Sequence, residues 1–125
     1  MGEGFRDRIV WQRAMELTTA IYELTRDFPR DEVYALTNQL RRAAVSIPSN
    51  IAEGHGRNSH GQLVQFLCMA RGSNYELQTQ LEIAGRLQYG VDAKRSLCHS
   101  LSIEVGKMLN ATVTSLESGR ASSKI

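Results

Sequence analysis

The segment from residue 53 to residue 60 reads EGHGRNSH and contains side chains that often bind metal ions. Glu53, His55 and His60 would offer one carboxylate and two imidazoles. Two zinc-binding histidines on one helix normally stand four residues apart, which these two do not, and no cysteine is near. We therefore interpret the segment as a solvated loop and expect no metal site.

Two further patterns would indicate catalysis, and both are incomplete. Ser46 shares its helical face with no histidine that could activate it as a nucleophile. Gly54 and Gly56 lack the strand and helix context of a phosphate-binding loop. His99 stands alone in its segment and reads as an ordinary boundary residue. We expect a protein with no catalytic residues, no cofactor and no enzymatic activity.

A row of polar side chains is the strongest candidate for a site. Its members recur at steps of three and four residues and therefore share one face of a helix. The row lies roughly 110° from the apolar face of the same segment, so it flanks the core. It consists of Gln39, Arg42, Ser46, Asn50 and Glu53.

The same segment contains Pro48, which has no backbone N–H to donate and clashes with the carbonyl group four residues earlier. A proline inside a helix costs about 3 kcal/mol. We expect the helix to bend near Pro48, with Ser46, Asn50 and the next helix satisfying the backbone groups that the proline leaves free.

The stretch RGSNYELQTQ carries a second polar row made of Ser73, Glu76 and Gln80. If the two segments pack antiparallel, residues equidistant from the intervening turn meet, which predicts an ion pair between Arg42 and Glu76. Gly72 would allow a close backbone approach. Two interpretations stay open: an internal network that fixes register or subunit pairing, and a binding site for a ligand or RNA.

A basic surface is the other candidate site. Arg41, Arg57, Arg71 and His55 could contact nucleic-acid phosphates, and an oligomer would multiply the patch. The alternative is that these arginines are simply solvated. Aromatic residues for base stacking are few, and we interpret Trp11, Tyr34 and Tyr75 as packing or subunit contacts.

Four segments with helical periodicity must position these residues. We expect caps at Asp31, Ser59 and Asp92, and helix ends at Pro29, at Gly54 or Gly56, and at Gly90. The apolar faces are Val10, Ala14, Leu17, Ile21, Leu24 and Phe28; then Leu36, Leu40, Ala43, Ile47 and Ile51; then Leu63, Phe66, Ala70, Leu77, Leu81, Ala84 and Leu87; and last Leu97, Leu101, Val105, Met108 and Thr112.

No stretch alternates as a strand would, and the breaks between segments are short. The sequence therefore predicts an all-α fold, a single up-down-up-down antiparallel four-helix bundle over residues 1–118 with a disordered tail at 119–125. The length of 125 residues suits one domain.

Composition excludes several classes of protein. Charged residues make up 22% and hydrophobic residues 42%, which is typical of a globular chain. The net charge of +2 permits RNA binding without requiring it. Cys68 and Cys98 form no metal or disulfide pattern, and no apolar run could span a bilayer, so we expect a cytoplasmic protein with no membrane association.

Three stretches together resemble one family: FRDRIVWQRAMEL, FPRDEVYALTNQLRRAAVSIPSNIAEGHGR and FLCMARGSNYELQTQLEIA. They are similar to the four-helix-bundle proteins of 23S ribosomal RNA intervening sequences, over residues 5–116. The most specific part is QLRRAAVSIPSNIAEG with ARGSNYELQTQL. Ala35 stands where the family pattern suggests glycine.

The resemblance implies a bacterial protein whose biochemical role is poorly defined. A related bundle, the accessory protein of diversity-generating retroelements, forms a pentameric ring and works with nucleic acid. By this resemblance we expect a homo-oligomer, a pentameric ring, with RNA as the leading ligand. The alternative is a ring that docks a partner polypeptide and binds no nucleic acid.

Overall fold

The computed structural model describes residues 4–119. A short 3-10 helix, η1 (Gly4–Asp7), leads into α1 (Ile9–Thr25), and a second, η2 (Arg30–Glu32), precedes α2 (Leu36–His55). The chain continues through α3 (His60–Arg86) and α4 (Asp92–Glu117). Within the described residues all regular structure is helical, as predicted. Of the predicted tail, only Gly119 falls inside the described range.

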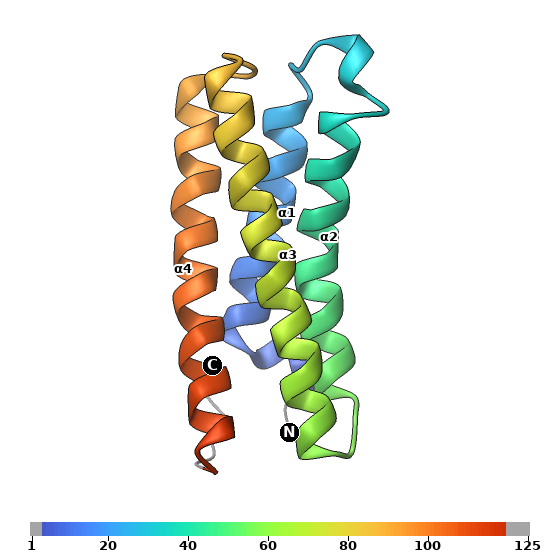
Figure 1. Cartoon of the computed structure of the whole chain (residues 1–125), viewed down its shortest axis with the longest axis vertical. Coiled ribbons are helices and arrows are strands. Elements are labelled where there is room, and N and C mark those ends of the chain that lie inside the picture. Colours follow the sequence, from blue (N-terminus) through green and yellow to red (C-terminus); the bar gives the residue numbers. More distant parts are fainter. Residues whose placement is uncertain (1–3, 120–125) are drawn as a thin grey trace.

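The four α-helices run alternately up and down and form a bundle (Figure 1). Each helix packs against its neighbours in chain order, and α4 closes the bundle against α1. The longest connection is that between α1 and α2, which carries η2 at one end of the bundle. None of the described helices combines the length and hydropathy needed to cross a membrane.

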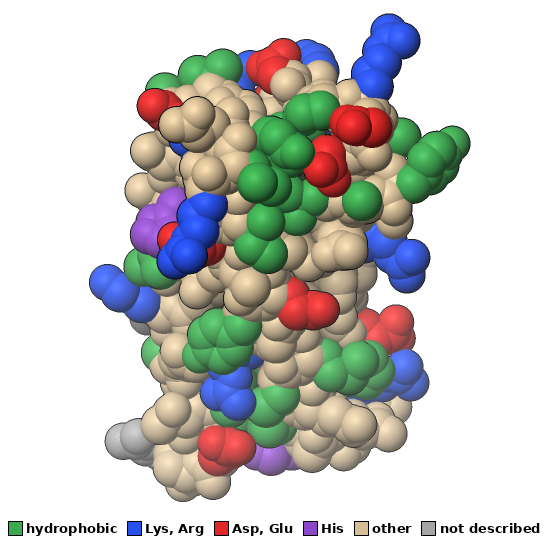
Figure 2. Space-filling view, turned by 45° about the horizontal axis from the view of Figure 1, so that its top comes forward, with side chains coloured by type: hydrophobic (Ala, Val, Ile, Leu, Met, Phe, Trp, Pro, Cys, Tyr) green, Lys and Arg blue, Asp and Glu red, His purple; other side chains and the backbone are tan. Residues whose placement is uncertain are grey.

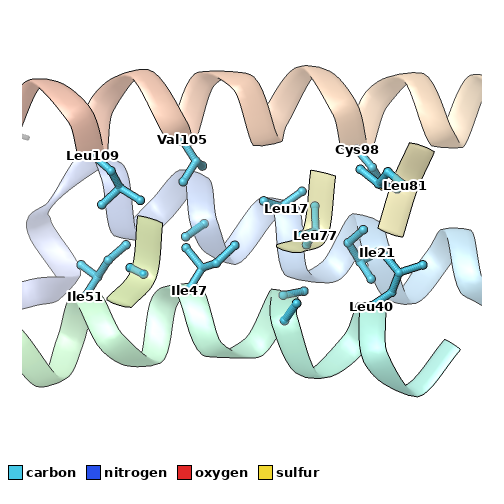
Figure 3. Close-up of a cluster of buried hydrophobic side chains, with 14 of the residues drawn as sticks. Leu17, Ile21, Leu40, Ile47, Ile51, Leu77, Leu81, Cys98, Val105 and Leu109 are labelled. Atoms are coloured by element: carbon cyan, nitrogen blue, oxygen red, sulfur yellow. The ribbon is translucent and has the colours of Figure 1, made fainter. Parts of the chain in front are cut away.

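Leucine, isoleucine, valine and alanine side chains from all four helices fill the interior (Figure 3). Every residue of the two apolar faces predicted for the first and second helices is buried. In α1 and α2 the periodicity alone therefore identified the inward side. Burying one such leucine stabilises the fold by about 2 kcal/mol.

The apolar face predicted for the fourth helix was partly wrong. Leu97 is 54% exposed and Leu101 is only half-buried, whereas Cys98 and Ser102 are fully buried. The inward face of α4 is rotated towards smaller residues, because the side chain of Asn74 on α3 packs against Ser102. Leu87, predicted to be inward, lies beyond α3 and is also exposed.

The starts of α2 and α4 differ from the prediction, while the start of α3 agrees with it. Ser59 caps α3 by accepting a hydrogen bond from the N–H of Gln62 at 3.3 Å. Asp31 lies in η2, and it is Glu32 whose carboxylate accepts from the N–H of Leu36 at 3.2 Å. Asp92 is the first residue of α4 rather than its cap.

The turn from α3 to α4 begins with a left-handed residue that is not glycine. Gln88 has φ of 60°, its N–H donates to the carbonyl of Gly85, and the N–H of Tyr89 donates to that of Ala84. These two bonds form a Schellman motif. Gly90, predicted to end the helix, follows it at φ of +79° and packs against α1.

Pro48 is buried inside α2, which continues through it without interruption. The carbonyl of Ala44 would normally accept from the N–H at position 48, which proline lacks. The hydroxyl of Thr18 on α1 lies 3.0 Å from that carbonyl oxygen and 2.8 Å from the carbonyl oxygen of Ala14 in its own helix, so its single proton is shared between the two. The expectation that Ser46, Asn50 and the next helix satisfy the freed group was therefore wrong, because α1 supplies the donor.

Candidate nucleic-acid interface

A groove between α2 and α3, the polar groove, collects most of the two predicted polar rows. Ser46 and Ser73 face each other across it, so the antiparallel register inferred from the turn is correct. The residues that line it are Asn38, Gln39, Arg42, Ala43, Ser46, Ser73, Glu76 and Gln80.

Three side chains at the α2–α3 seam form a hydrogen-bonded chain, and two of them, Ser46 and Ser73, line the polar groove. The hydroxyl oxygens of Ser46 and Ser73 are 2.8 Å apart. The amide nitrogen of Asn50 donates to the Ser46 hydroxyl and to the Ser46 carbonyl oxygen, both at 2.9 Å. The predicted network between the two helices thus exists at this level of the bundle. A hydrogen bond of this kind contributes about 1 kcal/mol to stability.

The predicted ion pair is absent from the described residues. Arg42 and Glu76 line the same groove, but neither has an ionic or hydrogen-bonding side-chain partner within residues 4–119. Both are exposed, so water satisfies their charges at little cost. Glu53 pairs with Arg57 at 2.9 Å instead of joining the network.

Two findings at the α2–α3 seam did not follow from the sequence. The side-chain oxygen of Gln80 is buried and has no hydrogen-bond partner among residues 4–119. Gly72 has open space around it, so it does not serve a close approach within the chain. Gly54 does: a Cβ there would lie 3.0 Å from the Cβ of Phe66.

The most buried polar contact lies between α3 and α4 and was missed. Asn74 is fully buried, and its amide nitrogen donates to the carbonyl of Ser102 at 3.0 Å. The hydroxyl of Ser102 donates back to the amide oxygen at 2.7 Å. The signal in the sequence was the run of small residues at Ser102 and Gly106, where a Cβ on Gly106 would crowd the Asn74 amide at 3.1 Å.

The three arginines predicted to bind nucleic acid lie on separate parts of the bundle. Arg41 reaches α1, where its Nε donates to the hydroxyl of Thr25 at 2.9 Å. Arg57 follows α2 near the opposite end and stacks over Phe66, with 5.0 Å to the ring centroid. Arg71 on α3 points to α4, where it donates to Asn110 at 3.3 Å. They do not form one patch.

The two histidines expected in a solvated loop lie instead at helix ends, His55 as the last residue of α2 and His60 as the first of α3, and they make different contacts. His55 is half-buried, and burial together with the nearby charge of Arg8 lowers its pKa. His60 donates from Nε2 to the carbonyl of Leu116 at 2.8 Å. Over residues 4–119, no three His, Cys, Asp or Glu side chains are grouped so that they could hold a metal ion.

One surface does gather arginines. Two hollows at the α1–α2 end of the bundle adjoin each other and share Val33, Thr37 and Arg41; we call them together the arginine surface. The residues that line it are Tyr22, Thr25, Arg26, Phe28, Pro29, Arg30, Val33, Thr37, Asn38, Arg41, Arg42 and Val45.

The arginine surface is lined by four arginines and by no carboxylate. Arg26 is paired with Glu23 at 3.0 Å, but Arg30, Arg41 and Arg42 form no ion pair with any described residue. The guanidinium of Arg41 stacks on Tyr22, 4.7 Å from the ring centroid. Figure 2 shows one face of the molecule, on which basic and acidic side chains are interspersed around a hydrophobic patch.

Residues 6–111 match the model of the family described as 23S rRNA-intervening sequence protein. This chain belongs to the 23S rRNA-intervening sequence protein family. The match covers the polar groove, the arginine surface and the buried Asn74–Ser102 contact. The family assignment inferred from the sequence is therefore confirmed.

A solved structure supports the fold of this 23S rRNA-intervening sequence family member. It is described as a protein with unknown function from the S23 ribosomal protein family of Bacteroides thetaiotaomicron, and it aligns with a TM-score of 0.77 at 21% identity. The alignment covers 85% of this chain and 96% of that one. No curated protein shows a significant sequence match.

Proposed function

We propose that this protein is a non-enzymatic, homo-oligomeric, cytoplasmic bundle that binds structured RNA through phosphate contacts on the arginine surface. The observation that carries the proposal is that Arg30, Arg41 and Arg42 share this surface with no carboxylate partner. Phosphates are the ligands that guanidinium groups bind best in a planar, bidentate way.

Electrostatics favours RNA binding at one local group of arginines over attraction by the overall charge of the protein. A net charge of +2 gives the monomer little overall attraction for RNA. Arginines without an ion-pair partner keep their full field, whereas those bonded to carboxylates, such as Arg86 with Glu82 at 3.3 Å, are largely neutralised. A ring, such as the pentamer that the family resemblance suggests, would repeat the surface once per subunit and raise affinity through multiple contacts.

The test is binding of a fluorescein-labelled RNA hairpin, followed by anisotropy between about 50 and 200 mM salt. Affinity should fall steeply as salt rises, because phosphate binding releases counterions. Arg41→Ala and Arg42→Ala should each weaken binding and reduce the salt slope by about 1. Arg86→Ala is the matched control, since its side chain is 80% exposed and already paired.

The same assay compares the arginine surface with the other predicted contacts. Arg57→Ala, Arg71→Ala and His55→Ala test the sites expected from the sequence, which lie elsewhere on the bundle. If these variants lose affinity while Arg41→Ala and Arg42→Ala do not, RNA binding stands but the arginine surface is the wrong site. No binding of the wild type at low salt overturns the proposal.

A second candidate function is docking of a partner polypeptide. It is favoured by an apolar hollow between α1 and α4, in which Ala20, Leu97 and Leu101 lie between Glu16, Glu23 and Lys94. A partner helix with apolar side chains would fit such a hollow, and its binding would depend little on salt. Leu97→Ser would weaken this mode and leave RNA affinity unchanged.

A further inference from the structure

Among the described residues, Tyr34 is the most exposed large apolar or aromatic side chain, at 93%. The next is Leu97 at 54%. The ring of Tyr34 makes no aromatic, cation–π or hydrogen-bonding contact with any other residue in the range 4–119. The interpretation of Tyr34 as a packing residue within the chain is therefore wrong.

The backbone that carries Tyr34 is held on both sides. The N–H of Val33 donates to the carbonyl of Arg30 at 3.2 Å, and that of Ala35 donates to Glu32 at 2.9 Å. The Glu32 carboxylate in turn accepts from the N–H of Leu36 and, at 3.0 Å, from the hydroxyl of Tyr89. An exposed ring on a fixed turn loses little conformational entropy when it binds a ligand.

Tyr34 also stands beside the phosphate-binding chemistry of the proposed function. Val33, the residue before it, lines both hollows of the arginine surface, as does Arg41. Tyr22, the tyrosine that lines that surface, already has the guanidinium of Arg41 over its ring. Tyr34 is thus the one aromatic ring at this surface, among the described residues, whose face is open.

We propose that Tyr34 is a stacking platform for an unpaired RNA base, so that the arginine surface selects looped or single-stranded RNA over a continuous duplex. The inference rests on the proposed function and names its substrate class. Aromatic side chains stack on bases of any sequence, but only where the bases are not already stacked within a helix. The arginines bind backbone phosphates, and Tyr34 stacks on an unpaired base of the same RNA.

The experiment compares two labelled RNAs with the same stem, one a hairpin with an unpaired loop and the other a blunt duplex, on the full-length protein. The hairpin should bind more tightly than the duplex. Tyr34→Ala should lower hairpin affinity by about 5- to 150-fold and leave duplex affinity and the salt slope unchanged. Tyr34→Phe keeps the ring and should bind as the wild type does.

Tyr75→Ala is the matched control, because Tyr75 is also exposed, at 52%, but lies on α3 away from the arginine surface. Equal affinities for hairpin and duplex, or a Tyr34→Ala variant that binds the hairpin normally, overturn the inference and leave the proposed function standing. A lower oligomer mass for Tyr34→Ala would identify Tyr34 as a subunit contact and overturn it too. If neither RNA binds the wild type, both proposals fail.

Discussion

The hydroxyl of Thr18 replaces a backbone donor that Pro48 removes from α2. We expect Thr18→Val to lower the free energy of unfolding by about 1–3 kcal/mol, because the carbonyl of Ala44 loses the proton that the Thr18 hydroxyl shares between it and the carbonyl of Ala14. In a Pro48→Ala background the new backbone N–H can donate to that carbonyl, so the same substitution should cost less than half as much. Urea unfolding of the four proteins measures the coupling.

The matched control for this cycle is Thr19→Val. Thr19 is exposed on the same helix, and its hydroxyl bonds only to the carbonyl of Glu16 within α1. Its replacement should change stability little and by the same amount in both backgrounds. Costs of Thr18→Val that are equal with and without Pro48 would show that the proline is tolerated for another reason.

A half-buried histidine, His55, makes the free energy of unfolding depend on pH. The pKa of His55 lies below its ordinary value of 6.5 because burial and the charge of Arg8 disfavour the imidazolium. Between the lowered folded pKa and the unfolded pKa, the unfolded chain binds more protons. The free energy of unfolding should therefore be at its full value above about pH 6.5 and fall as the pH drops through that window.

His55→Gln should remove this part of the pH dependence, as seen in urea midpoints measured at pH 7.5 and pH 5.5. The exposed His99 serves as control. His99→Gln should leave the difference between the urea midpoints at pH 7.5 and pH 5.5 as it is in the wild type. A wild-type pH dependence in His55→Gln would place the responsible group elsewhere.

Single residues were predictable where the pattern was local. The Ser59 cap needs only its own backbone and Gln62, and the Ser46–Ser73 contact needs only the register of one turn. Arg42 and Glu76 were not, because long exposed side chains choose between water and several partners at nearly equal free energy. Asn74 was missed because burial of a polar residue depends on the helix that packs over it.

At the scale of elements, two glycines on neighbouring helices have opposite roles. A Cβ at Gly54 would lie 3.0 Å from Phe66 and 3.2 Å from Leu63, so α2 and α3 approach closely there. Gly54→Ala should force the helices apart and cost about 1–3 kcal/mol. Gly72→Ala meets no atom within 4 Å and should raise stability by about 0.5–1 kcal/mol, because alanine favours the helix.

Thermal unfolding of the two alanine variants tests this opposition, with each protein serving as the control for the other. The reading would be wrong if Gly54→Ala melted at or above the wild-type temperature. A loss of stability in Gly72→Ala would mean that something packs on that part of α3 in solution, for which a second copy of the chain is the first candidate.

The elements themselves followed from periodicity, except where composition misled it. The apolar faces of α1 and α2 consist mostly of leucine and isoleucine, with alanine at a few positions, so their burial was unambiguous. Along α4 the inward positions include Cys98, Ser102 and Gly106, while leucine at position 97 lies outside. A prediction that places the largest apolar residues inward assigns such a face incorrectly. The small residues are inward here because the side chain of Asn74 packs against them, and the sequence of α4 alone does not show this.

For the whole molecule, the charges and apolar groups left on the surface point to contacts beyond one chain. Met69 and Ile83 on α3 and Leu97 on α4 are each more than 40% exposed. Some exposed apolar area is normal for a monomer, so these side chains alone do not define an interface. Arg42 and Glu76 have no ionic or hydrogen-bonding side-chain partner within residues 4–119. These charged and apolar side chains are therefore available for contacts between the subunits of the proposed homo-oligomer.

We expect sedimentation equilibrium to give a mass at least twice the 14.0 kDa of one chain. Because association stabilises the folded subunits by mass action, the melting temperature should also rise with protein concentration. Salt should affect the oligomer less than it affects RNA binding if apolar contacts dominate the interface. A mass of 14.0 kDa at every concentration, with a constant melting temperature, would show a monomer, and RNA affinity would then depend on a single arginine surface.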